Sequence, residues 1–208
     1  MIMKKLLFAI VAFFVAAPSF AQFSSGGFSL DEEHIYWGMR IGVSMGSVGG
    51  DLKTDKGRTG MTLAGIVGLR VSESTPVFLE SGLYYTQRGA NKLEDVADND
   101  GTTHVKPGGH LNYLEIPVLM KYGISTENNI AILPFIGPYL GFAVAGDTRY
   151  LNRAEMGFKL GCGVEWNNLY LEGGYQFGIT NIADDKHMKA SSPSAHGHAF
   201  QINFGINF

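Results

Sequence analysis

The chain has 208 residues, 45% of them hydrophobic, and a formal net charge of −3. This length suits a single domain, and the slightly acidic balance excludes a basic surface for nucleic acid. Cys162 is the only cysteine, which excludes an intramolecular disulfide and a cysteine-rich metal site and argues against a lipid-anchored N-terminus. The 28 glycines follow no triplet period, so the chain is not collagen-like.

The first 21 residues have the anatomy of a signal peptide. Lys4 and Lys5 form a basic start, residues 6–17 are an apolar run, and small residues precede a cleavage site between Ala21 and Gln22. A membrane-spanning helix would need roughly 20 apolar residues, more than this run offers. We therefore expect an exported protein with a short periplasmic tail at residues 22–34 and one domain at residues 35–208.

From residue 35 onward, apolar residues alternate with small or polar ones, which is the period of β-strands. The predicted strands, in chain order, cover about residues 35–46, 60–71, 77–88, 114–122, 130–146, 155–166, 169–180 and 200–208. The fifth stretch is apolar on both faces. We place its outward face at Ile136, Leu140, Phe142 and Val144, because Gly137 and Gly141 then share the opposite face.

The non-apolar face of these strands favours a membrane barrel over a soluble sandwich or a lipocalin-like barrel. Glycine is common there, and it suits a narrow lumen better than an exposed soluble surface. The same face carries five basic and five acidic residues, a balance that allows pairing inside an enclosed lumen. This predicted lumen charge network comprises Arg40, Arg70, Arg88, Lys121, Lys159, Glu80, Glu115, Glu155, Glu165 and Glu172.

The connections alternate in length, as in bacterial transmembrane barrels. Residues 72–76, 125–129 and 167–168 are predicted periplasmic turns, and residues 48–58, 89–110, 147–153 and 182–198 are predicted external loops. Both ends of the barrel domain then lie on the side of the short turns. At this side we expect a girdle of aromatic residues, of the kind found at membrane interfaces. Its predicted members are Trp37, Tyr122, Trp166 and Phe208.

These patterns predict an all-β fold: a closed antiparallel transmembrane β-barrel of about eight strands in meander order, in the size class of OmpA and OmpX. The last strand must then pair with the first, because an open sheet edge is not tolerated in lipid.

Several segments resemble a known family. Residues 113–122 read YLEIPVLMKY, similar to the YLEIPVLLKY strand of the PorT-like outer-membrane β-barrel family of Bacteroidetes. Residues 134–141 are similar to the family's GPYLG strand, and residues 79–89 to its PELLYSQKG segment, from which Ser81 and Gly82 depart. The resemblance implies a barrel in the bacterial outer membrane, in contact with its lipids. It leaves a role in type IX secretion open and supplies no catalytic motif.

The terminal Phe208 resembles the C-terminal residue of other outer-membrane proteins, which implies recognition by the barrel-assembly machinery. An eight-stranded lumen is filled by side chains, so a general diffusion porin is not expected. We therefore expect a non-enzymatic barrel without cofactor or metal, whose external loops contact a protein or a surface polymer. A narrow channel or transporter is the main alternative.

A membrane-lipid-modifying enzyme is the less favoured alternative. Its candidate residues are His196 and His198 with Ser191, Ser192 or Ser194 and Asp184 or Asp185. These residues fall in a predicted loop, which gives no reason to expect the rigid geometry that hydrolysis needs. The loop histidines His104, His110, His187, His196 and His198 lack regular metal-ligand spacing, and Asp95, Asp98 and Asp100 do not match a calcium loop.

Overall fold

The computed structural model describes residues 35–50, 57–72, 74–89, 92–97, 103–107, 110–126, 129–146, 153–180 and 195–208. The predicted signal peptide and the predicted tail at residues 22–34 lie outside these ranges. Within them, no helix is both long and apolar enough to cross a membrane.

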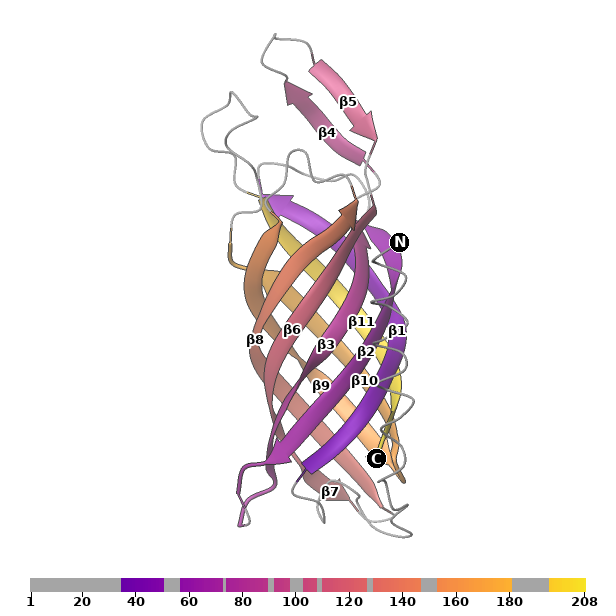
Figure 1. The fold of residues 1–208 in the computed structure, drawn as a ribbon, viewed down its shortest axis with the longest axis vertical. Helices are drawn as coiled ribbons and strands as arrows, with labels where there is room; N and C mark the ends of the chain where they lie inside the picture. Colours follow the sequence, from indigo (N-terminus) through magenta and orange to yellow (C-terminus); the bar gives the residue numbers. More distant parts are fainter. Residues whose placement is uncertain are drawn as a thin grey trace, which may run out of the picture.

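Eight long strands form the wall of a closed antiparallel barrel (Figure 1). They are β1 (Ile35–Gly50), β2 (Arg58–Arg70), β3 (Val77–Gly89), β6 (His110–Tyr122), β8 (Ile130–Gly146), β9 (Ala154–Trp166), β10 (Leu169–Gly178) and β11 (Ala195–Asn207). Each strand pairs with the next one along the wall, and β11 returns to pair with β1 from Gly38↔Asn207 to Gly50↔Ala195. The predicted closed meander is confirmed.

Alternate residues of each strand point out of the barrel and into it. The predicted outward residues of β8 (Ile136, Leu140, Phe142 and Val144) are 47–52% exposed, which confirms the register of this strand. Gly137 faces inward where β8 approaches β6 closely, and a Cβ atom there would overlap the carbonyl oxygen of Val118. The close approach of the two strands explains why glycine occupies the inner face.

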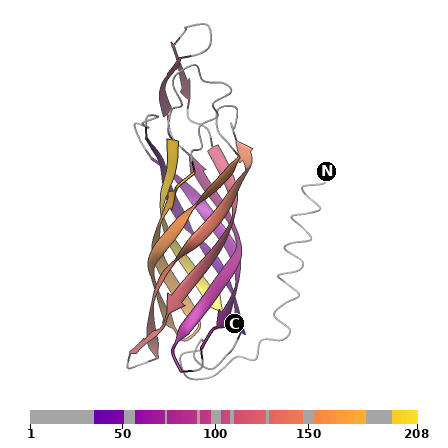
Figure 2. The same ribbon diagram turned by 90° about the vertical axis from the view of Figure 1, so that its left-hand side faces the viewer.

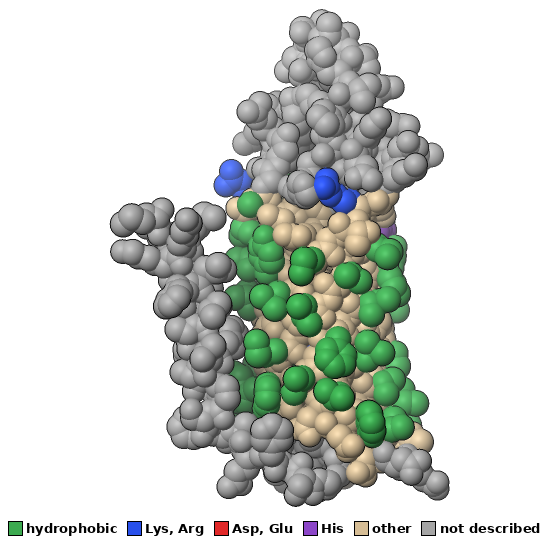
Figure 3. All heavy atoms as spheres, turned by 90° about the vertical axis from the view of Figure 1, so that its right-hand side faces the viewer, with side chains coloured by type: hydrophobic (Ala, Val, Ile, Leu, Met, Phe, Trp, Pro, Cys, Tyr) green, Lys and Arg blue, Asp and Glu red, His purple; other side chains and the backbone are tan. Residues whose placement is uncertain are grey.

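Hydrophobic side chains are spread over the outer wall (Figure 3). Among the described residues on the face shown, Lys and Arg side chains lie only near one end of the barrel, and no Asp or Glu side chain is visible. Such a surface would be costly in water but matches the hydrocarbon interior of a bilayer. Exposed members of this apolar surface include Ile41, Met61, Leu63, Met120, Leu171 and Phe204.

The two ends of the barrel differ, as Figures 1 and 2 show. At one end the connections are short, and three asparagines, Asn129, Asn167 and Asn168, adopt positive φ angles of 58°, 46° and 73°. Asparagine tolerates this left-handed conformation better than most residues, so it suits these turns. A short strand, β7 (Ile124–Thr126), also lies at this end and pairs with the start of β8.

At the other end, β4 (Lys92–Ala97) and β5 (Thr103–Pro107) form a separate two-stranded antiparallel sheet beyond the wall (Figures 1 and 2). The sequence predicted only a long loop here, because this segment lacks clear alternation.

The strands at this end also run further than predicted. β1 continues to Gly50 and β11 begins at Ala195, so His196 and His198 lie in a strand and not in a loop. Their Gly-, Ser- and His-rich sequence carries no alternation signal, and pairing with the neighbouring strand extends the ladder. β10 ends at Gly178, two residues before the predicted end at residue 180.

Candidate functional site

The lumen is the most highly organised polar region that the structure describes. Nine of the ten predicted network residues are buried: Arg40, Arg88, Lys121, Lys159, Glu80, Glu115, Glu155, Glu165 and Glu172. Arg70 differs, because it is the last residue of β2 and lies half-buried at the short-turn end. Its Nε donates a hydrogen bond to the carbonyl oxygen of Ser72 at 2.9 Å.

Four charged residues form a first group, the Glu80 cluster, which comprises Glu80, Arg40, Lys121 and Glu172. Lys121 Nζ lies 2.8 Å from Glu80 Oε1, and Arg40 Nη2 lies 3.6 Å from Glu80 Oε2. The hydroxyl of Tyr36 donates a further hydrogen bond to Glu80 Oε2 at 2.9 Å. Glu172 Oε2 is more distant, at 3.8 Å from Lys121 Nζ. Lys121 is the next-to-last residue of β6, so this cluster lies toward the short-turn end.

A second group, the Glu115 cluster, comprises Glu115, Arg88, Lys159 and Glu155. Glu115 accepts from Lys159 Nζ at 2.6 Å and from Arg88 Nη2 at 2.8 Å. Arg88 also contacts Glu155 Oε2 at 3.1 Å, and the Tyr139 hydroxyl donates to Glu155 Oε1 at 2.6 Å. Arg88 and Glu155 lie at the loop ends of β3 and β9, so this cluster occupies the opposite half of the lumen.

Aromatic rings cover the buried cations. The Arg40 guanidinium lies 4.1 Å from the centroid of the Tyr170 ring, and the Arg88 guanidinium lies 4.1 Å from that of Tyr113. A ring face attracts a cation, and the attraction is stronger where water is excluded. Each cluster therefore combines ion pairs with cation–π contacts, which offsets part of the cost of burying charge.

Asparagine and glutamine side chains complete the hydrogen-bond network of the lumen. Most of them were not predicted as members of the network, because that prediction rested on the balance of charged residues. Gln201 Nε2 donates to Gln176 Oε1 at 2.9 Å, and Gln176 Nε2 donates to Glu115 Oε1 at 3.4 Å. Asn203 Nδ2 donates to Glu172 Oε1 at 2.8 Å, and Asn207 Nδ2 donates to a carboxylate oxygen of Glu165 at 2.6 Å. Three of them could have been predicted from the sequence, because they are the inward polar residues of the last strand (Gln201, Asn203 and Asn207).

Inward glycines make room for the tyrosines. A Cβ atom on Gly68 would overlap the ring of Tyr36, and one on Gly163 would overlap the ring of Tyr170. The two tyrosines therefore lie flat across glycines of neighbouring strands, where they reach the Glu80 cluster. This packing accounts for glycine on the inner face in a lumen of this width.

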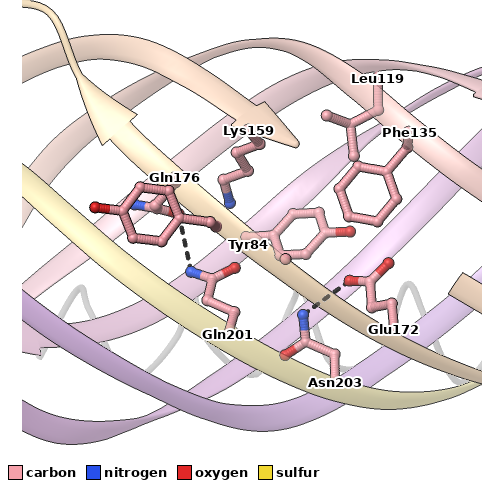
Figure 4. A pocket seen from close by; sticks show the side chains of 10 residues that line it. Tyr84, Leu119, Phe135, Lys159, Glu172, Gln176, Gln201 and Asn203 are labelled. Carbon is pink, nitrogen blue, oxygen red and sulfur yellow. Dashed lines mark hydrogen bonds between the residues drawn. The ribbon is translucent and has the colours of Figure 1, made fainter. Parts of the chain in front are cut away.

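Between the two clusters lies a small cavity of about 10 Å³ (Figure 4). Its lining includes Tyr84, Leu119 and Phe135, together with Glu172 from one cluster and Lys159 from the other. A cavity of this size holds about one water molecule. This cavity therefore has no room for an organic solute.

Aromatic residues mark the short-turn end of the outer wall. Trp37, Tyr122 and Trp166 are exposed there, and Phe208 is half-exposed. Phe208 also closes the seam of the barrel, since its amide donates to the Trp37 carbonyl at 2.7 Å and its carbonyl accepts from the Trp37 amide at 3.0 Å.

The candidate enzyme residues are only partly described. His198 lies on the outer wall, where its Nδ1 is 3.1 Å from the Tyr175 hydroxyl and the two rings stack. His187, Ser191, Ser192, Ser194, Asp184, Asp185, Asp98 and Asp100 lie outside the described residues, as do the side chains of His104, His110 and Asp95. Within the described part of the chain, no group of three or more His, Cys, Asp or Glu residues is arranged to hold a metal ion.

Comparison with known proteins identifies the family. Residues 20–184 match the model of the outer membrane protein beta-barrel domain, which is more than half of the chain. The chain belongs to this outer-membrane β-barrel family. The family and the closed barrel together support a location in the bacterial outer membrane, in a lipid environment.

The chain is also similar to several solved outer-membrane proteins, at low sequence identity. Ail, the attachment invasion locus protein of Yersinia pestis, is 13% identical with a TM-score of 0.46, over 85% of this chain and 100% of its own. The Neisserial surface protein A is 12% identical with a TM-score of 0.47, over 85% and 98% of the two chains. OprG from Pseudomonas aeruginosa is 11% identical with a TM-score of 0.48, over 83% and 95%. No curated protein sequence matches the chain significantly.

Proposed function

We propose that the protein is a non-enzymatic outer-membrane barrel whose body is a closed membrane anchor and whose external loops bind a partner. The observation that carries this proposal is the filled lumen. Two ion-pair clusters occupy its opposite halves, and the cavity that lies between them has a volume of only about 10 Å³. A hydrated ion would have to displace buried, paired charges in order to pass.

Conductance across a planar lipid bilayer tests the closed lumen. The barrel, refolded and inserted without its signal peptide, is expected to give no steady openings above the bare bilayer. The double variant Arg88→Ala/Lys121→Ala removes one cation from each cluster and serves as the control, because openings require a change in both halves of the lumen. Steady, ion-selective openings of the unmodified barrel would establish the narrow-channel alternative instead.

The β4–β5 hairpin supports a binding role for the external end. It extends the chain beyond the barrel wall on the side of the long connections (Figure 1). A paired hairpin gives a partner a more ordered surface than a flexible loop would, and this lowers the entropy cost of binding. Replacing residues 92–107 with a short Gly/Ser linker is expected to abolish partner capture on cells, while the barrel still inserts and keeps its heat-modifiable mobility on gels.

The class of partner is proposed from the family resemblance. The similarity of residues 113–122 to the PorT-like strand supports an association with type IX secretion, in which the partner would be a secreted protein or a component of that machinery. Deletion of the gene in a host with this secretion system should reduce secreted cargo. Normal secretion, with loss of binding to a surface polymer, would instead favour a polymer partner.

We also propose that the barrel-assembly machinery recognises the segment at Phe208. Phe208 is joined to Trp37 by two backbone hydrogen bonds at the seam between the first and last strands. Deletion of Phe208 should reduce the amount of folded barrel in outer-membrane fractions without altering partner binding per folded barrel. Normal insertion of the shortened chain would argue against this role.

Catalysis is not part of the proposal. The hydrogen bond between His198 Nδ1 and the Tyr175 hydroxyl faces outward on the wall, and it is accounted for by packing between β10 and β11. We expect no turnover of lipid A or phospholipid by the purified barrel. Turnover that disappears in His198→Ala and in His196→Ala would support an enzyme instead.

A further inference from the structure

The cavity between the two ion-pair clusters is lined by polar atoms that lack a hydrogen-bond partner. The Tyr84 hydroxyl and Glu172 Oε2 are both buried, and neither has a hydrogen-bond partner among the described residues. Leaving a buried polar atom unpaired costs free energy, and a charged one costs more. Two such atoms at one small cavity therefore point to a ligand that pairs with them.

The size and polarity of the cavity limit that ligand to one small molecule. Its volume of about 10 Å³ is enough for one water molecule and too little for an organic solute. Glu172 Oε2 can only accept hydrogen bonds, whereas the Tyr84 hydroxyl can also donate one. A water molecule matches this pair, because it can donate to the carboxylate oxygen and accept from the hydroxyl.

We propose that the cavity binds one structural water molecule, which joins the Glu80 cluster to the Glu115 cluster. Glu172 belongs to the first cluster, and its 3.8 Å separation from Lys121 Nζ is too long for a direct hydrogen bond. Tyr84 lies beneath Lys159 of the second cluster, with Nζ 4.8 Å from the ring centroid. In Figure 4 the Tyr84 hydroxyl and the Glu172 carboxylate point toward one another. The water thus links the two halves of the lumen through polar contacts.

Two adjacent glycines provide a matched pair of variants. Gly174 lines the cavity, and a Cβ atom there would lie 3.1 Å from Phe135 Cζ, so Gly174→Ala fills the space that the water needs. A Cβ atom on Gly173 would meet nothing within 4 Å, so Gly173→Ala adds the same methyl group without touching the cavity. Neither change removes a polar atom.

The test is magnetisation transfer from water to the side-chain amide protons of Asn203, measured by NMR on the mature barrel in lipid nanodiscs. We expect transfer from a long-lived water in the unmodified barrel and in Gly173→Ala, and its loss in Gly174→Ala. Absence of transfer in the unmodified barrel would mean a dry void, and transfer that persists in Gly174→Ala would mean that the water lies elsewhere; either result would overturn the proposal.

Two further measurements distinguish a bound water molecule from a dry void and from a bound cation. If Gly174→Ala does not fold, Tyr84→Phe provides the second variant: deleting a hydroxyl bonded to water should lower stability, whereas deleting an unpaired one should raise it and refute the proposal. A bound monovalent cation is tested by replacing Na⁺ with K⁺ or N-methylglucamine at constant ionic strength. The unfolding midpoint should not change. A shift in the midpoint that is specific to one cation would refute the bound water and indicate a bound ion.

Discussion

The Glu115 carboxylate holds two cations, so we predict that Glu115→Gln strongly destabilises the barrel. Glutamine keeps the volume of the side chain but removes its charge. Arg88 retains Glu155 at 3.1 Å, whereas Lys159 loses the carboxylate that lies 2.6 Å from its Nζ. Breaking a buried pair by removing one partner costs roughly 3–5 kcal/mol. Since only one of the two cations loses its carboxylate, we expect about 3 kcal/mol, at the lower end of that range.

Urea unfolding of the barrel refolded into lipid vesicles measures this change, with the fluorescence of Trp37 and Trp166 as the probe. Met61→Leu on the outer wall is the control and should change the free energy of unfolding by less than about 0.5 kcal/mol. Adding Lys159→Met to Glu115→Gln should restore part of the lost stability, because the buried ammonium is then gone. A Glu115→Gln barrel within about 1 kcal/mol of the unmodified one would refute the reasoning, since a buried cation without its partner must cost more than that.

Three further predictions concern packing and orientation. In Gly68→Ala the new methyl group meets the Tyr36 ring, so we expect a loss of about 1–3 kcal/mol in the same unfolding assay, and unchanged stability would contradict this packing. Ser81→Ala removes the hydrogen bond of 2.7 Å from Ser81 Oγ to the Pro117 carbonyl oxygen. We expect the free energy of unfolding to fall by about 1 kcal/mol, and an equally stable variant would show that the bond does not stabilise the barrel. Cys162 is exposed at the middle of β9, so in vesicles it should react with a lipid-soluble maleimide and not with a charged one; rapid charged labelling would contradict its position in the bilayer.

The departure of Ser81 from the family resemblance has a structural explanation. The residue pairing between β3 and β6 is interrupted between Ser81 and Tyr84, where Pro117 has no amide hydrogen to donate. At this interruption the Ser81 hydroxyl donates a hydrogen bond to the Pro117 carbonyl oxygen. Sequence alone gave no reason to connect these two residues, which are 36 positions apart. Their relation depends on the register between β3 and β6.

The alternation of apolar and polar residues was enough to predict the barrel, its strand order and the face of nearly every wall residue. Because side chains of a strand alternate strictly, one outward residue determines the direction of all the others. This reasoning held even for β8, where inward Gly137 and Gly141 decided the register. It was weakest at the loop ends, where His196 and His198 lie in a sequence without alternation and become part of β11 only through pairing with β1.

By itself, then, the sequence determined which residues enter the lumen and that their charges balance, since both follow from local alternation and composition. Only the tertiary structure decided how those charges pair. Glu115 of β6 contacts Arg88 of β3 and Lys159 of β9. These contacts depend on the stagger between strands around the barrel, which cannot be read from the sequence of any one strand. The same stagger divides the network into two clusters and leaves the cavity between them, because side chains from different strands must reach the same height in the lumen before they can bond.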